Sequence, residues 1–241
     1  MMSQPPGLAL AVAAISFLST AATIVLPAQP PSDSSVIRQV DSAVAARLVN
    51  VVGYTVTEHY AVLRGKDQAQ PVAEMTVETT YNKDSGKTYT ILSQNGSEIV
   101  RRLVLGAILD NEKTINLPGN REGAWITSAN YEMKMSPAGS QQVDGRDCLV
   151  LAIAPRRKAP YLIEGTLWVD SKDGSIVQIK GTSSRSPSVF TGPTQLMRQY
   201  ANVNGFAMAT HARAVSNSFL LGETIVTIDY QDYKMQLRPA G

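Results

Sequence analysis

The stretch IEGTLWVDSKDGSIVQIKG, residues 163–181, alternates apolar and polar side chains on both sides of a turn. Successive side chains of a strand point to opposite faces of a sheet, so residues of equal parity share a face. The side expected to be apolar carries Ile163, Gly165, Leu167, Val169, Val177 and Ile179. Asp173-Gly174 between the two runs is a signal for a two-residue turn. The stretch predicts an antiparallel hairpin with one apolar face.

The same alternation continues through most of the chain. Asp144-Gly145 and Asn204-Gly205 are two further turn signals, and Val226 and Ile228 occupy the apolar parity of the last strand. Ten strands are expected, at about residues 54–62, 72–81, 87–93, 130–137, 146–154, 161–170, 175–183, 194–203, 206–217 and 223–236. Because this count is high for a flat open sheet, the sheet is expected to curl into a barrel, half-barrel or sandwich.

Two segments have helical rather than strand periodicity. Apolar residues between Val36 and Leu48 step by three and four, which predicts a helix at about 35–50, with an N-cap from among Ser32, Asp33 and Ser34. The segment 97–113, capped by Ser97, has one apolar face made by Ile99, Val100, Leu103, Val104, Ala107 and Ile108. These helices are the elements available to cover the apolar concave side of the sheet.

The first 28 residues contain no Asp, Glu, Lys or Arg. Residues 7–26 form an uncharged apolar stretch that precedes a Pro/Ser-rich linker at 29–35, a layout typical of a secretory signal peptide. Thr20-Ala21-Ala22 and Ala28 are candidate cleavage sites, and cleavage is favoured. The stretch is also long enough to remain as an uncleaved anchor. We therefore expect an exported, periplasmic protein with one domain at 36–238.

Composition excludes several classes of function. A net charge of +2 and a pI of 8.6 do not give the basic surface of a nucleic-acid-binding protein. One cysteine, Cys148, and two histidines, His59 and His211, offer few metal ligands. The sequence thus predicts no metal, no cofactor and no nucleic-acid partner.

No phosphate-binding loop, dinucleotide-binding glycine motif or nucleophile elbow occurs. Glu58 with Glu74, or Glu164 with Asp170, would make a carboxylate pair of the glycosidase kind, but a chain with 20 acidic residues offers many such pairs. A hydrolase is the third-ranked hypothesis, and the prediction is a protein that is not an enzyme.

Arg156, Arg157 and Lys158, between two prolines, form the densest charge cluster. Such a run is either a solvated loop between strands or a basic lip that meets anionic lipid headgroups or an acidic partner. Arg101 and Arg102 are candidates to extend this lip.

The motif Gly165-x-Leu-Trp-Val-Asp170, the Asp-Gly turn and the returning Ile-Val-x-Ile strand lie within residues 143–181, and ETIVTIDYQDYKM follows at 223–235. This pattern resembles outer-membrane lipoprotein-sorting proteins of the LolA-like superfamily, which includes LolA, LolB and RseB. The resemblance implies an antiparallel half-barrel of about 10–11 strands whose apolar concave face is closed by helices and shelters acyl chains.

The predicted function is therefore that of an exported carrier or chaperone for acyl chains of lipoproteins or other lipids. The cavity residues are predicted to be Ile163, Leu167, Val169, Val177, Ile179, Val226 and Ile228, and the lid residues Leu103, Val104 and Ile108. Ordinary core packing would produce the same alternation. We expect a monomer that meets membrane-bound donor or acceptor proteins. The alternative is a periplasmic sensor or interaction module, without catalysis, that binds a protein partner on the same scaffold.

Overall fold

The computed structural model describes residues 32–65, 70–186, 192–218 and 222–239, so the predicted signal peptide or anchor lies outside the described residues. In chain order the elements are α1 (Asp33–Asn50), β1 (Val51–Arg64), β2 (Ala73–Asn82), β3 (Gly86–Gly96), α2 (Glu98–Val100), the π-helix η1 (Arg101–Gly106), α3 (Ala107–Ile115), the 3-10 helix η2 (Arg121–Ala124), β4 (Tyr131–Val143), β5 (Arg146–Pro155), β6 (Ile163–Asp170), β7 (Ile176–Ser183), β8 (Gln195–Val203), β9 (Phe206–Ser218) and β10 (Gly222–Leu237). The Ser32 hydroxyl accepts a hydrogen bond from the Ser35 N–H, so α1 begins inside the segment predicted as a linker.

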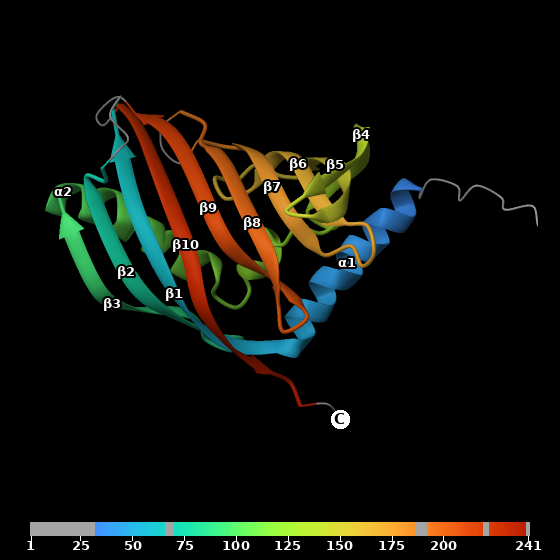
Figure 1. Cartoon of the computed structure of the whole chain (residues 1–241), viewed down its shortest axis with the longest axis horizontal. Helices are drawn as coiled ribbons and strands as arrows, with labels where there is room; N and C mark the ends of the chain where they lie inside the picture. Colours follow the sequence, from blue (N-terminus) through green and yellow to red (C-terminus); the bar gives the residue numbers. More distant parts are fainter. Residues whose placement is uncertain (1–31, 66–69, 187–191, 219–221, 240–241) are drawn as a thin grey trace, which may run out of the picture. The chain divides into compact units, whose positions relative to one another are not determined.

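All ten predicted strands are present among the described residues. They form one antiparallel sheet in the order β3-β2-β1-β10-β9-β8-β7-β6-β5-β4. The sheet is curved and open rather than closed into a barrel, and its first and last strands in sequence, β1 and β10, pair within the sheet, third and fourth from the β3 edge (Figure 1). The predicted curved antiparallel sheet with helices on its concave face is therefore confirmed.

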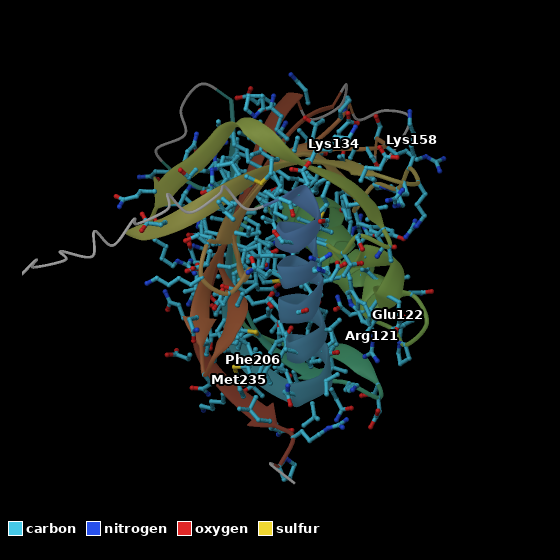
Figure 2. All side chains as sticks on the ribbon, turned by 90° about the vertical axis from the view of Figure 1, so that its right-hand side faces the viewer. Arg121, Glu122, Lys134, Lys158, Phe206 and Met235 are labelled. Atoms are coloured by element: carbon cyan, nitrogen blue, oxygen red, sulfur yellow. The ribbon has the colours of Figure 1, made fainter. Side chains whose placement is uncertain are left out.

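The helices divide the concave face between them. Helix α1 lies within the curve of the sheet (Figure 2), where it contacts β1, β4 and β9. The run α2–η1–α3 lies against the other end of the sheet, where η1 contacts β2 and α3 contacts β3 (Figure 1). Each helix covers its own part of the sheet and buries its own cluster of apolar side chains.

We name these clusters by their helices. The buried residues of the α1 core are Val36, Val40, Tyr131, Met133, Leu151, Ile153, Ala159, Leu162, Leu167, Val169, Ile176 and Ile179. Those of the α3 core are Tyr60, Val62, Ala73, Met75, Val77, Val100, Leu105, Leu109 and Val226. A third, smaller cluster comprises Val51, Tyr54, Val56 and Met208, and the side chains of Phe206 and Met235, labelled in Figure 2, pack against it.

Two of the three predicted hairpin turns have the expected form. Asp144 and Gly145 both have positive φ (48° and 74°), as do Asn204 and Gly205 (51° and 88°), which is the pattern of a type I′ turn. The two-residue turn predicted at Asp173-Gly174 is wrong, because a longer loop joins Asp170 to Ile176.

The glycine of that loop has a different role. Gly174 has φ 71°, and a Cβ atom there would lie 2.6 Å from the backbone carbonyl carbon of Gln39 in α1. Glycine at this position is therefore required both by the positive φ of the chain reversal and by the close approach of this loop to α1.

Candidate functional site

The structure places the seven predicted cavity residues in different surroundings. Leu167, Val169 and Ile179 belong to the α1 core, where Leu167 and Val169 are 0% exposed. Val226 belongs to the α3 core, and Ile228 packs against it. The predicted set is thus split between the two ends of the concave face.

Val177 shows where simple alternation fails. Leu167 pairs with Ile179, but Val169 pairs with Ile176, because a β-bulge interrupts the register between Trp168 and Val169. A bulge inserts an extra residue and reverses the parity beyond it. Ile176 therefore occupies the place in the α1 core that alternation assigned to Val177, and Val177 is buried outside that core.

The predicted lid helix is rotated by a π-helical turn. The residues of α2, η1 and α3 that are buried are Val100, Leu105 and Leu109, spaced by five and then four. A π-helical turn contains one more residue than an α-helical turn, so it rotates the side chains that follow it about the helix axis. Leu103, predicted as a lid residue, is 55% exposed, whereas Val104 and Ile108 pack partly buried against the α3 core.

A pocket of about 360 Å³ lies between this helical run and the edge of the sheet. Its lining residues are Met75, Ile91, Gln94, Glu98, Arg101, Arg102, Gly106 and Leu109, and we call it the edge pocket. Met75 and Leu109 also belong to the α3 core, so the pocket is a solvent-accessible extension of that core. None of the ten predicted cavity and lid residues is among its lining residues.

Exposed apolar side chains gather around the edge pocket. Ile91 in its wall is 51% exposed, and the neighbouring segment adds Leu92 (56%), Ile99 (63%) and Leu103 (55%). Half of the large apolar side chains that are exposed in the described residues therefore lie between positions 91 and 103. A cluster of this kind marks a surface that meets an apolar ligand, a membrane or another protein.

An ionic cluster joins α3 to the sheet beside the α3 core. The Glu112 carboxylate lies 2.8 Å from the Lys87 ammonium of β3 and 3.9 Å from the Arg198 guanidinium of β8. The charge of Lys87, together with that of Arg198, outweighs desolvation and lowers the pKa of Glu112 to about 2. Burial alone would lower the pKa of Lys87. The negative charge of Glu112 and interactions with neighbouring tyrosines outweigh this effect, so the pKa of Lys87 is well above its usual value. One carboxylate thus connects strands far apart in the sheet.

Further polar groups are buried on the same face. Glu58, only 2% exposed, accepts a hydrogen bond from the Tyr60 hydroxyl. Burial, followed by the negative charge of Glu58, raises the pKa of Tyr60. Thr79 and Tyr89 are direct cross-strand neighbours, and each has a buried hydroxyl without a hydrogen-bond partner in the described part of the chain. The concave face is therefore apolar under each helix and polar beside Glu112, rather than apolar throughout.

The basic run at 156–158 is largely held by its own surroundings. Arg157 donates to the Gly123 carbonyl (2.7 Å) and to the Tyr161 hydroxyl (2.8 Å), and Arg156 donates to the Ser128 carbonyl (3.0 Å). Lys158 is exposed at the periphery of the folded unit (Figure 2). Arg101 and Arg102 line a pocket at the β3 edge, whereas this loop leaves β5 near the β4 edge. They do not extend one lip.

The two histidines lie on β1 and β9, the strands on either side of β10, which carries Asp229 between them. Asp229 pairs with His59 in the β1–β10 ladder and with His211 in the β9–β10 ladder, and the His211 Nδ1 lies 2.6 Å from an Asp229 carboxylate oxygen. His59 and His211 are 152 positions apart, so no spacing in the sequence predicts that they flank the same aspartate. Among the described residues, no group of three or more His, Cys, Asp and Glu side chains is placed to hold a metal ion.

Two further observations concern predictions made from composition. Cys148 is buried in β5, and burial raises the pKa of its thiol. No helix in the described ranges is long and apolar enough to span a bilayer.

No protein-family model matches the sequence, and none of the curated proteins does. A solved LolA superfamily protein from Nitrosomonas europaea is 13% identical, with a TM-score of 0.42 over 87% of this chain and 96% of the other. An outer membrane lipoprotein-sorting protein domain from Vibrio parahaemolyticus is 11% identical, with a TM-score of 0.44 over 82% and 91%. MucB, solved with MucA(peri), is 12% identical, with a TM-score of 0.26 over 83% and 93%. Each of these solved structures is similar to this chain at 13% identity or less.

Proposed function

We propose that this protein is an exported, non-catalytic carrier that shelters an acyl chain of a lipoprotein or another lipid in the edge pocket. The observation that carries the proposal is the pocket itself: an opening of about 360 Å³ whose floor, Met75 and Leu109, is continuous with the α3 core. This volume lies at the lower end of the range of roughly 300–1,000 Å³ typical of small-molecule sites. It suits one chain rather than several.

The physical driving force is removal of apolar surface from water. Each methylene group transferred from water to an apolar site contributes about 0.8 kcal/mol, and the exposed wall residue Ile91 would be covered at the same time. A chain that lies along the α2–η1–α3 run would also cover Leu103, which packing of the helix leaves exposed. The ligand would therefore complete the apolar packing at this end of the sheet.

The α1 end is less suited to a ligand. Its predicted cavity residues Leu167 and Val169 are 0% exposed, and Val36 and Val40 of α1, also 0% exposed, belong to the same cluster. A cavity lined by these residues would require α1 to move away from the sheet. That these residues line a ligand cavity remains a prediction. A variant in the α1 core therefore serves as the control for binding in the edge pocket.

We assign no catalytic role to the buried carboxylates. Glu112 is paired with Lys87 and Arg198, and Glu58 accepts a hydrogen bond from the Tyr60 hydroxyl. Both carboxylates therefore have partners within the fold. The second candidate function, a module that binds a protein partner, is favoured by one observation: Ile99 and Leu103 are exposed on the helical run outside the pocket lining.

Gly106 allows a direct test of the carrier. It lines the edge pocket with ordinary helical φ and ψ, and a Cβ atom there would meet nothing closer than the Arg101 carbonyl oxygen at 3.7 Å. Gly106→Phe should fill the pocket without backbone strain, and Gly106→Ala is the matched control. We expect a fluorescent fatty-acyl probe to bind the wild type and Gly106→Ala, and to bind Gly106→Phe at least about tenfold more weakly.

Three results would redirect the proposal. Equal binding by Gly106→Phe and wild type would place the chain elsewhere, and loss of binding only in Leu167→Ala would place it in the α1 core. A folded wild type that binds no probe, and yields no lipid when its periplasmic preparation is extracted with solvent, would exclude the carrier. The partner-binding alternative would then be tested with Leu103→Ser.

A further inference from the structure

Two neighbouring arginines line the edge pocket beside its apolar floor. Arg101 and Arg102 are the first residues of the π-helix η1, and both contribute to the lining together with Gly106 of the same turn. The wider turn of a π-helix brings successive side chains closer in angle than an α-helix does. The irregular turn that rotates Leu103 outward therefore also presents two guanidinium groups to one pocket.

Arg101 is half-buried and Arg102 is exposed, and neither has an ion-pair partner among the described residues. No ion pair or side-chain hydrogen bond joins either guanidinium to another side chain within residues 32–65, 70–186, 192–218 or 222–239. The Arg101 Nε is buried and has no hydrogen-bond partner in the same residues. A buried donor left without an acceptor costs free energy, so a ligand that supplies the acceptor is stabilised here.

The remaining polar lining sets the sign of the ligand's charge. Glu98 is the one carboxylate among the lining residues, against two guanidinium groups, and Gln94 adds a neutral amide. The lining therefore carries a net positive charge beside an apolar floor. Guanidinium groups form their strongest hydrogen bonds with carboxylate and phosphate oxygens, often two at a time.

We propose that the edge pocket selects single-chain amphiphiles with an anionic head, whose carboxylate or phosphate is bound by Arg101 and Arg102 while the chain lies over Met75 and Leu109. This inference rests on the proposed carrier function and adds to it the chemical class of the ligand. Burial of an anion beside an unpaired guanidinium gives charge-assisted hydrogen bonds that an uncharged head cannot form.

Three probes with the same chain test this selection: dodecanoate, dodecyl phosphate and uncharged dodecanol, titrated calorimetrically at low salt. The wild type should bind both anions at least about tenfold more tightly than dodecanol. The Arg101→Gln/Arg102→Gln variant should bind all three with the affinity of dodecanol. Preference for one anion would identify the head as a carboxylate or a phosphate.

The control variant removes the same charge elsewhere. Lys134 and Lys180 are exposed on β4 and β7, so Lys134→Gln/Lys180→Gln should keep the anion preference. Circular dichroism and thermal unfolding establish that each variant is folded. If the wild type binds all three probes with equal affinity, the anionic selection is overturned but the carrier proposal stands. The same holds if the lysine variant loses as much anion binding as the arginine variant. Absence of binding by every probe, dodecanol included, overturns the carrier and this inference together.

Discussion

The two ends of the concave face are covered by helices in different ways. Helix α1 is regular over its 18 residues and carries Val36 and Val40, each 0% exposed, in a filled core. The other cover is interrupted by the π-helix η1, exposes Leu103 and leaves the edge pocket open. One sheet thus carries both a closed core and an open pocket, because a single irregular turn changes which side chains a helix buries.

The largest expected difference between the two ends is in the response to a shortened leucine. Leu167→Ala should lower the free energy of unfolding by about 3–4 kcal/mol, because the closed α1 core leaves a cavity that water cannot fill. Leu109→Ala should cost only about 2 kcal/mol, because Leu109 already borders an open pocket. Urea unfolding of both variants measures this. Equal losses would mean that the α3 end is packed as tightly as the α1 end.

A smaller effect is expected from the ionic cluster that holds α3. Glu112→Gln should cost about 2 kcal/mol, because it leaves the charge of Lys87, 11% exposed, without its partner at 2.8 Å. Adding Lys87→Met should recover part of the loss. A double variant less stable than Glu112→Gln would show that Lys87 stabilises the fold without Glu112.

The same cluster predicts a pH dependence with a definite sign. The folded-state pKa of Glu112, about 2, is below its ordinary value, so its contribution to stability is complete above about pH 5 and decreases as pH falls toward 2. The difference in unfolding free energy between wild type and Glu112→Gln should therefore shrink over that range. A difference that stays constant from pH 6 to pH 2.5 would contradict the lowered pKa.

The smallest effect on stability is expected at the α1 end, in the basic loop. Arg156→Gln/Lys158→Gln should change the free energy of unfolding by less than about 0.5 kcal/mol, because both residues are exposed. If the loop meets anionic lipid, the variant should partition onto anionic vesicles about thirtyfold more weakly, since each of the two charges near such a surface contributes about 1 kcal/mol. Unchanged partitioning in a sedimentation assay would leave this loop as a solvated connection.

The strands of this fold are readable from the sequence because their signals are local. Alternation between Ile163 and Asp170 requires only neighbouring residues, and Asn204-Gly205 specifies its own turn. The exceptions arise where geometry departs from an ideal period. A helical period of 3.6 placed Leu103 on the buried face, and a strand period of two placed Val177 with Ile179. The π-helix and the β-bulge each add one residue that no periodic pattern contains.

The site was less predictable than the fold because its parts come from distant positions. Lys87, Glu112 and Arg198 lie on three elements, and no spacing in the sequence joins them. The edge pocket likewise combines Met75 of β2 with Leu109 of α3. The sequence shows Arg101 and Arg102 as a basic pair. Their position in the lining of the edge pocket depends on how η1 packs on β2, which the sequence pattern does not predict.

The pairing of β1 with β10 has a consequence for how the chain reaches its native state. Val51 lies opposite Leu237, so the ladder between β1 and β10 forms only after β10, the last strand in sequence, has been made. Contacts between such distant residues slow folding, because a large loop must close before its contacts stabilise it. Until β10 arrives, the edges of β1 and β9 are unpaired strands of the kind that promote association between chains. A protein built this way benefits from protection during synthesis and refolds best when dilute.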